Sequence, residues 1–90
     1  MTFQIYMVRC SDKSIYTGFT NNLDLRIKQH KLGVYPKCYT FKRRPIELIW
    51  TQEVFTYEEA QRLEVKLKKW SRAKKLALAK GDWEEVPRLA

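Results

Sequence analysis

The chain has 90 residues, a length that suits one small domain rather than two separate cores. Its hydrophobic fraction of 44% includes three Trp, five Tyr and four Phe, and this supply of large apolar side chains excludes a disordered chain. Eighteen Lys and Arg outnumber ten Asp and Glu, and the resulting net charge of +8 favours nucleic acid or an anionic surface as the partner.

The cysteines and the apolar segments exclude further classes of protein. Cys10 and Cys38 lie far apart without a Cys-x-x-Cys spacing, and His30 is the only histidine, so this chain alone cannot build a zinc cage. We interpret both cysteines as reduced thiols, which are more often small core residues than nucleophiles. No run of about 18 apolar residues occurs, and the sequence opens directly on a strand pattern, so we expect a cytoplasmic protein without a membrane segment.

The segment Gln4–Gly18 predicts a β-hairpin, in which two runs of β-forming residues flank the polar connection 11–14. Because side chains alternate along a strand, Tyr6 points away from the aliphatic face of its strand. Pairing of the two strands then sets Tyr6 and Tyr16 on one side of the hairpin. These tyrosines are the first candidate for a site, although tyrosine also lines half-buried sheets for packing alone.

The residues after the hairpin predict a helix over Leu23–Leu32, with asparagine before its start and glycine after its end. The first and last residues of this helix, together with Ile27, are expected to form its buried stripe. Arg26 and His30 lie four positions apart and therefore share a face beside that stripe, where both can lean over the hairpin. A basic pair of this kind is also typical of a solvated flank.

The segment from Val34 to Arg44 predicts a loop with an unusual density of basic and aromatic side chains. Its cations are suited to phosphates, while Tyr39 or Phe41 can offer a stacking face to a base. The candidate phosphate-binding residues of this loop are Lys37, Lys42, Arg43 and Arg44. The same composition is also typical of a solvated loop.

The segment Ile46–Phe55 is rich in β-forming residues and follows a proline, and so predicts a third strand. We expect this strand to be longer than the first two and to lie either in the centre of the sheet or beside the first strand.

The C-terminal part of the chain predicts helices. Residues 56–59 match a capping box at the start of a helix, and Glu64 lies at the margin of its apolar stripe, where a carboxylate can reach solvent or a shared cleft. The stripe, which is expected to pack on the sheet, consists of Ala60, Leu63, Leu67 and Trp70. A break near Ser71 precedes a further helix that Gly81 ends, and Trp83 in the tail can dock.

These elements, in the order β-β-α-β-α-α, predict an α/β (α+β) fold in which a three-stranded antiparallel sheet is flanked by two to three helices. Residues 1–80 are expected to form the single domain and residues 81–90 a C-terminal tail. We expect a monomer.

The ordered set of two tyrosines, Arg-x-x-x-His and a later glutamate resembles the GIY-YIG nuclease domain family, especially its small stand-alone bacterial members. Gln4-Ile5-Tyr6 stands where that family has Gly-Ile-Tyr, and Tyr16-Thr17-Gly18 stands where it has Tyr-Ile-Gly. Arg26 and His30 follow on the first predicted helix, and Glu64 occupies the place of the family's metal-binding carboxylate. The likeness covers residues 1 to about 80, and the two departures from the motif leave both tyrosines in place.

The resemblance implies a divalent-metal-dependent endonuclease that hydrolyses phosphodiester bonds in structured or damaged DNA, with RNA not excluded. Glu64 would hold one Mg²⁺ or Mn²⁺ ion, and Arg26 would hold the scissile phosphate through its planar guanidinium. Either Tyr6 or His30 would take the proton of the attacking water, and Tyr16 would position water or phosphate. A phenol titrates near pH 10 and needs cations to ionise at neutral pH, whereas the unperturbed pKa of histidine suits the task better.

The alternative function is a nucleic-acid-binding module whose cleavage is weak or lost. The basic loop at 42–44 would serve such a module, as would the helical cations Lys68, Lys69 and Arg72. Binding alone requires no lone carboxylate in a basic cleft, so the presence of Glu64 favours the enzyme. Ninety residues leave little room for a second recognition domain, so such an enzyme is either promiscuous and slow or delivered by a partner protein.

Overall fold

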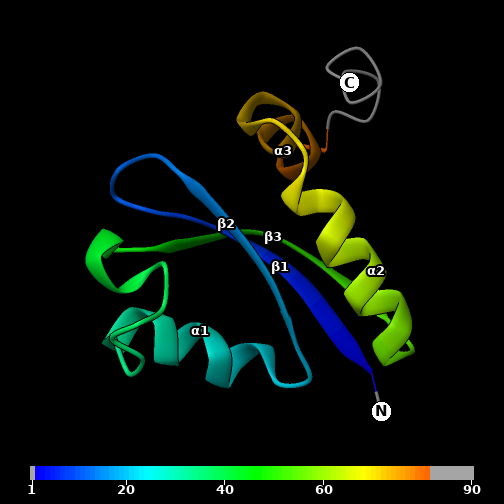
Figure 1. Ribbon diagram of the computed structural model, residues 1–90, viewed down its shortest axis with the longest axis horizontal. Helices are drawn as coiled ribbons and strands as arrows, with labels where there is room; N and C mark the ends of the chain where they lie inside the picture. The colour runs from blue at the N-terminus through cyan, green and yellow to red at the C-terminus, as the bar shows by residue number, and fades with distance from the viewer. Residues whose placement is uncertain (1, 82–90) are drawn as a thin grey trace.

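A computed structural model describes residues 2–81, in which three antiparallel strands form one sheet with helices against both of its faces (Figure 1). The elements are β1 (Phe3–Arg9), β2 (Ile15–Thr20), α1 (Leu23–Leu32), a short 3₁₀ helix (Phe41–Arg43), β3 (Glu47–Val54), α2 (Tyr57–Lys68) and α3 (Arg72–Ala79). The predicted α+β fold and its order β-β-α-β-α-α are confirmed. The predicted docking of Trp83 lies outside the described residues.

β1 is the central strand of the sheet, which has the order β2-β1-β3 with both neighbours antiparallel to β1. The expectation that β3 lies beside β1 is confirmed, and the alternative that β3 lies in the centre is wrong. Residues 5–8 of β1 are each at most 1% exposed, so this strand is buried on both faces. β3 exposes polar side chains such as Thr51 and Glu53, which an edge strand tolerates and a central strand does not.

The hairpin turn forms where the polar connection predicted it. The Cys10 amide donates to the Ser14 carbonyl at 2.9 Å, and the Ser14 amide donates to the Asp12 carboxylate at 3.0 Å. The Ser14 hydroxyl also bonds to that carboxylate, and these hydrogen bonds hold the pKa of Asp12 below its usual value. The resulting register places Tyr6 opposite Gly18, which brings the two halves of the candidate motif together.

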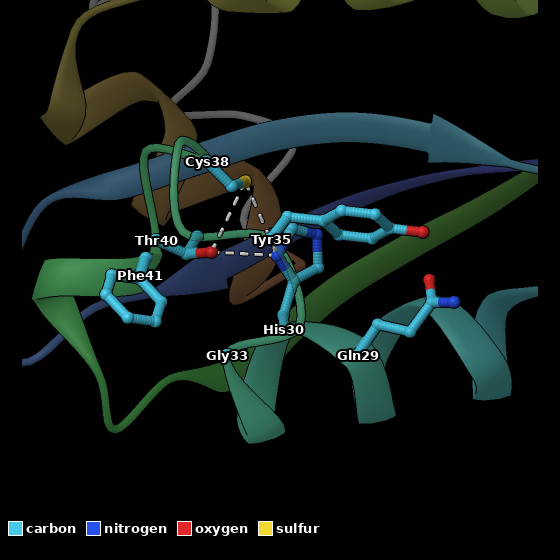
Figure 2. Close-up of a pocket in the computed structure, with 7 residues that line it drawn as sticks. All are labelled: Gln29, His30, Gly33, Tyr35, Cys38, Thr40 and Phe41. Carbon is cyan, nitrogen blue, oxygen red and sulfur yellow. Dashed lines mark hydrogen bonds between the residues drawn. The ribbon is translucent and has the colours of Figure 1, made fainter.

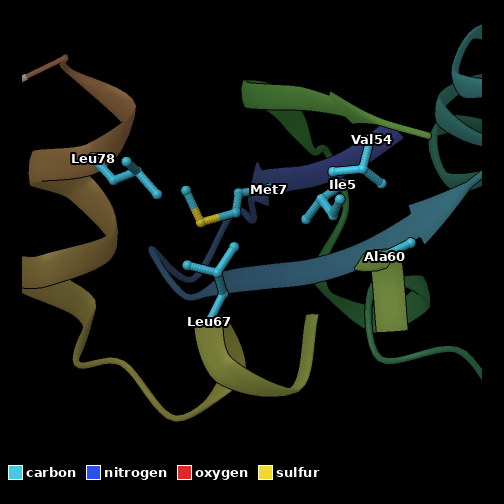
Figure 3. Packing of buried hydrophobic residues seen from close by; sticks show 6 residues of the cluster. All are labelled: Ile5, Met7, Val54, Ala60, Leu67 and Leu78. Atoms are coloured by element: carbon cyan, nitrogen blue, oxygen red, sulfur yellow. The ribbon is translucent and has the colours of Figure 1, made fainter. Parts of the chain in front are cut away.

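One face of the sheet packs against α2 and α3 through aliphatic side chains. This cluster consists of Ile5, Met7, Val54, Ala60, Leu67 and Leu78, and Figure 3 shows Met7 between side chains of α2 and α3. The predicted stripe of α2 is confirmed, because Leu63 and Trp70 pack against the same cluster. The capping predictions also hold: the Thr56 hydroxyl accepts from the Glu59 amide at 3.1 Å. The Ser71 hydroxyl caps α3 in the same way.

The other face of the sheet packs against α1 and carries Tyr6. The buried side of α1 consists of Leu23, Ile27 and His30, with His30 only 4% exposed. The expectation that Leu32 completes this stripe is wrong, because its side chain is 65% exposed. Leu32 follows Leu23 by about two and a half turns and so faces the opposite side of the helix, whereas His30 follows it by about two turns. His30 therefore lies in the stripe rather than beside it.

Within residues 2–81, no helix has the length and apolar character needed to cross a membrane.

Candidate active site

Tyr6 projects from the central strand and lies against the backbone of β2 at Gly18. A Cβ atom at Gly18 would stand 2.6 Å from the Tyr6 hydroxyl oxygen and 2.8 Å from the ring carbon that bears it. Both distances are far below a van der Waals contact, so only glycine admits the Tyr6 ring at this position. The glycine of the Tyr-x-Gly motif therefore creates the space in which the buried Tyr6 hydroxyl sits.

A hydrogen-bonded chain links Tyr6 to the loop after α1. The Tyr6 hydroxyl lies 2.9 Å from His30 Nε2, and His30 Nδ1 lies 2.8 Å from the Thr40 hydroxyl. The Thr40 hydroxyl donates to Cys38 Sγ at 3.5 Å, so its oxygen is left to accept from Nδ1–H. This network assigns the proton to Nδ1 and makes Nε2 the acceptor of the Tyr6 hydroxyl. We refer to Tyr6, His30 and Thr40 as the relay.

Both titratable groups of the relay are held neutral at neutral pH. Burial raises the pKa of Tyr6 above its ordinary value, and nearby Tyr16 raises it further, while the positive charge of Arg26 opposes them. Burial also lowers the pKa of His30, and Arg26 lowers it further. In the protein alone, burial outweighs the charge of Arg26 in its effect on the pKa of Tyr6. A neutral imidazole that already accepts from Tyr6 is the stronger candidate base.

Tyr16 lies beside the relay, and its ring is the base of a stack that continues through Tyr39 to Arg43. Its ring centroid is 6.4 Å from that of Tyr6 and 5.6 Å from that of His30. Tyr39 stacks on it at 5.8 Å with an interplanar angle of 19°, and the Arg43 guanidinium lies 3.8 Å from the Tyr39 ring centroid. Burial, followed by the neighbouring Cys38 thiol and the Glu64 charge, raises the pKa of Tyr16.

Arg26 and Glu64 act on the same two tyrosine hydroxyls from helices on either side of the sheet. Arg26 belongs to α1 and is half-buried, with its guanidinium 6.0 Å from the Tyr35 ring. Glu64 belongs to α2 and has a side chain only 18% exposed. The charge of Arg26 lowers the pKa of Tyr6 and Tyr16, and the charge of Glu64 raises both, although burial dominates each. The structure thus brings Tyr6, Tyr16 and His30 into direct contact, and the charges of Arg26 and Glu64 are near enough to shift the pKa of both tyrosines.

The carboxylate of Glu64 fits a magnesium-type ion better than a transition metal. Within residues 2–81, no group of three or more His, Cys, Asp or Glu side chains could hold a metal ion. A divalent ion at Glu64 would therefore rest on one carboxylate and water, which is an arrangement that Mg²⁺ accepts readily. The ion pair from Glu64 to Lys68 is long, at 3.4 Å, and lies within one helix, so it is a weak competitor for the carboxylate.

The predicted phosphate-binding cations fall into two groups, and one arginine of each group contacts the hairpin turn. In the loop group, the Arg43 side chain bonds to Asp12 at 3.0 Å and to the Tyr39 carbonyl at 2.8 Å. In the helix group, Arg72 bonds to the Lys13 carbonyl at 2.7 Å.

The remaining cations of the two groups differ in the contacts that they already make within the protein. Arg44 bonds to the Phe41 carbonyl at 2.9 Å, with its guanidinium over the Phe41 ring. Lys68 pairs with Glu64. The other lysines of the two groups, Lys37, Lys42 and Lys69, are exposed, as is Lys68. Arg43 and Arg44 therefore also hold the loop in shape, whereas the exposed lysines are better placed to contact phosphate.

Sequence reasoning missed the contribution of the loop between α1 and β3. Thr40 is 1% exposed and fixes His30, and Cys38 lies beside both residues, yet the segment reads as a solvated loop. The available signal was its aromatic content, since Tyr39 and Phe41 both take part in the packing around the relay. No local pattern identifies Thr40 as the partner of a histidine ten positions earlier.

Comparisons with known proteins add a family likeness to this geometry. The model of the GIY-YIG catalytic domain family matches residues 2–77. A UPF0213 protein of Syntrophus aciditrophicus is 39% identical over 82 residues, which cover 91% of this chain and 94% of that protein. The solution NMR structure of a UPF0213 protein from Bacillus halodurans has a TM-score of 0.56 at 40% identity, covering 89% of this chain and 84% of that one. A protein from E. faecalis, also solved by NMR, has a TM-score of 0.63 at 31% identity and covers 94% and 90% of the two chains.

Proposed function

The chain belongs to the GIY-YIG catalytic domain family, and from this premise we propose that it is a divalent-metal-dependent endonuclease that hydrolyses phosphodiester bonds in DNA. The family is one of nucleases, so the chain has a nuclease-type fold. The observation that carries the proposal is the buried hydrogen bond between Tyr6 and His30, with Tyr16 beside both rings and the charges of Arg26 and Glu64 near enough to shift the pKa of both tyrosines. A cation for phosphate, a carboxylate for metal and a proton acceptor are the groups that this hydrolysis requires.

The relay supplies a path for the proton of the attacking water. The Tyr6 oxygen accepts a hydrogen bond from the water while its own hydroxyl proton is donated to His30 Nε2. As the water attacks phosphorus, its proton moves to Tyr6 and the Tyr6 proton moves to His30, so neither step requires a preformed phenolate. Thr40 accepts from Nδ1–H and keeps the imidazole oriented for this transfer.

The remaining groups hold the substrate. The planar guanidinium of Arg26 binds the phosphate that is attacked, and Tyr16 positions the water or the phosphate. A Mg²⁺ or Mn²⁺ ion bound at Glu64 would supply charge neutralisation at the phosphoryl group and stabilisation of the leaving oxygen. The basic groups beside the hairpin turn bind phosphates on either side of the cut.

The direct test measures nicking by the parent and by Glu64→Gln on branched, nicked, single-stranded and duplex DNA and on matched RNA, with Mg²⁺ or Mn²⁺. We expect the variant to lose metal-dependent nicking by at least about 100-fold while its low-salt DNA binding stays equal or becomes tighter. Glu58→Gln, an exposed position in the first turn of the same helix, is the matched control and should nick like the parent. Parental nicking by Glu64→Gln would contradict the metal role.

A nucleic-acid-binding module with weak or lost cleavage is the second candidate function, and the two basic groups at the hairpin turn favour it. Under this alternative, changing Lys42, Arg43 and Arg44 to Ala weakens binding across sequences and flattens its salt dependence, while no substrate of the panel is nicked. Unaltered affinity in this variant would place the binding surface elsewhere. In either case we propose a cytoplasmic monomer that is promiscuous or is brought to its substrate by a partner protein.

A further inference from the structure

The loop between α1 and β3 holds two arginine side chains over aromatic rings. The Arg43 guanidinium lies 3.8 Å from the Tyr39 ring centroid, and its Nη1 donates to the Tyr39 carbonyl at 2.8 Å. The Arg44 guanidinium lies 4.6 Å from the Phe41 ring centroid, and its Nε donates to the Phe41 carbonyl at 2.9 Å. Each guanidinium is therefore held over a ring by a hydrogen bond to the backbone of the same aromatic residue.

The two arginines differ in what covers the rest of the guanidinium. A Cβ atom at Gly33 would stand 2.6 Å from Arg44 Cζ, so the backbone at the end of α1 packs directly on that group. Arg43 Nε donates to the Asp12 carboxylate at 3.0 Å, and because guanidinium N–H bonds lie in the plane, this partner lies at the edge of the group. With its side chain 37% exposed, Arg43 leaves the face turned away from Tyr39 open to solvent.

The Tyr39 ring is fixed beside the candidate active site. Tyr39 lies between Cys38 and Thr40, and Figure 2 shows the side chains of both neighbours directed at His30. The Tyr39 ring also stacks on that of Tyr16 with an interplanar angle of 19°. A ligand that binds on top of this stack meets a surface that is already ordered, so little side-chain entropy is lost on binding.

We propose that the open face of Arg43 stacks an unpaired base of the DNA next to the phosphate that is cleaved. A guanidinium plane stacks on nucleobases, and such a contact tolerates any sequence because every base has a planar face. In an intact duplex the neighbouring pairs cover both faces of each base, so the partner is a single-stranded nucleotide. This inference rests on the proposed function and names its substrate: DNA with a single-stranded flap, gap or branch at the cut.

Stacking can be separated from the phosphate contact that the charge of Arg43 also permits. A lysine at this position keeps the charge but has no plane to offer. Loss of the plane should therefore leave the salt dependence of DNA binding unchanged, whereas loss of a phosphate contact flattens it. The measurement that distinguishes the two is the difference in affinity between DNA with a base and DNA without one at the stacked position.

The test measures binding, without a divalent metal, of a duplex that carries a short thymidine flap and of a set of versions in each of which one flap nucleotide is abasic. For the parent we expect one of these replacements to weaken binding by at least about fivefold, the lower end of the range for stacked bases. Arg43→Lys should reduce that difference to less than about twofold and keep the parental salt dependence.

Two neighbouring positions supply matched controls. Lys42→Ala removes an exposed charge that has no plane, so it should flatten the salt dependence and retain the difference between the flaps. Arg44→Lys removes a guanidinium that Gly33 already covers, so it should retain the difference as well.

A parent that binds every abasic flap as tightly as the complete one would overturn the proposal, and so would an undiminished difference in Arg43→Lys. If Arg43→Lys binds too weakly for the comparison, NMR of the parent decides. The Arg43 Nε–H signal should move upfield with the complete flap, because a stacked ring shields it, and should move less with the flap that lacks the stacked base. Equal shifts with both flaps would overturn the proposal.

The outcome for the proposed function is separate, because binding is measured without cleavage. If the difference in affinity depends on Arg43 but no DNA is nicked in Mg²⁺, the stacking face stands and the nuclease proposal fails. If the parent nicks DNA but shows no such difference, the nuclease proposal stands and the stacking face fails.

Discussion

The two faces of the sheet contrast sharply in the side chains they bury. The face under α2 and α3 is closed by aliphatic groups such as Ile5, Met7 and Leu67, each at most 1% exposed. The face under α1 buries an aromatic hydroxyl, an imidazole and a threonine that bond to one another. Buried polar groups stabilise little once their desolvation is counted, so these hydrogen-bonded groups contribute less to folding than the aliphatic side chains do. The polar face holds groups that can exchange protons through their hydrogen bonds.

One strand, β1, contributes side chains to both faces. β1 alternates Ile5 and Met7 toward the aliphatic face with Tyr6 and Val8 toward the other. The packing of Ile5 and Met7 fixes the strand, and the fixed strand places Tyr6 without any contribution from the polar network. Substitutions on the two faces should therefore have separable effects on stability and on activity.

The largest expected effect on stability is at Leu67, which is 1% exposed on the aliphatic face. Leu67→Ala removes buried methyl groups and leaves a cavity, so we expect a loss of about 2–5 kcal/mol in the free energy of unfolding. Urea denaturation measures this loss. Val65→Ala, at an exposed position of the same helix, should change it by less than about 0.5 kcal/mol. Equal losses in the two variants would contradict the assignment of the core to this face.

A smaller effect on stability is expected at Gly18, where the polar face touches β2. Gly18→Ala places a methyl group against the Tyr6 hydroxyl, and we expect a loss of about 1–3 kcal/mol, since the buried ring has little room to move. In a Tyr6→Phe background the nearest atom is removed, so the same substitution should cost less. An identical cost in both backgrounds would mean that the methyl group is accommodated by the backbone instead.

The smallest expected effect is the pH dependence that His30 gives to stability. Burial lowers the pKa of His30 in the folded chain, so the unfolded chain binds more protons as the pH falls below about 6.5. The contribution of His30 is therefore fully present above that pH and is lost as the pH falls toward its folded pKa. Urea unfolding of the parent between pH 5 and 8 should show this slope, and His30→Gln should flatten it. A slope that is unchanged in His30→Gln would assign the effect to other groups.

The helices and the β-hairpin can be predicted from the sequence because the residues that start and end each of them lie within a few positions of one another. The caps at Thr56 and Ser71, and the glycine that follows α1, act within a few residues, so a pattern reveals them. The β-hairpin with its tyrosines on one side is equally local. The central position of β1 was left open because strand order depends on which strand is buried on both faces, which is a property of the whole sheet.

The candidate site was predictable only in part, for the same reason. The tyrosines stand out from the hairpin pattern and Arg26 from its spacing to His30, whereas the role of Glu64 follows only from the family resemblance, since no local pattern groups it with Tyr6. Thr40 and Cys38 escaped notice because they reach His30 through the folding of an irregular loop. The wrong prediction for Leu32 shows the limit of helical periodicity: the polar residue His30 lies on the buried side of α1, where an apolar residue is expected.

The most direct test of the account is the nicking rate of Tyr6→Phe in Mg²⁺, measured beside its free energy of unfolding. Phenylalanine keeps the ring against Gly18 and removes only the hydroxyl that bonds to His30. We expect a loss of nicking of at least about 100-fold, with a change in unfolding free energy of no more than about 1.5 kcal/mol. A folded Tyr6→Phe that nicks DNA at the parental rate would contradict it.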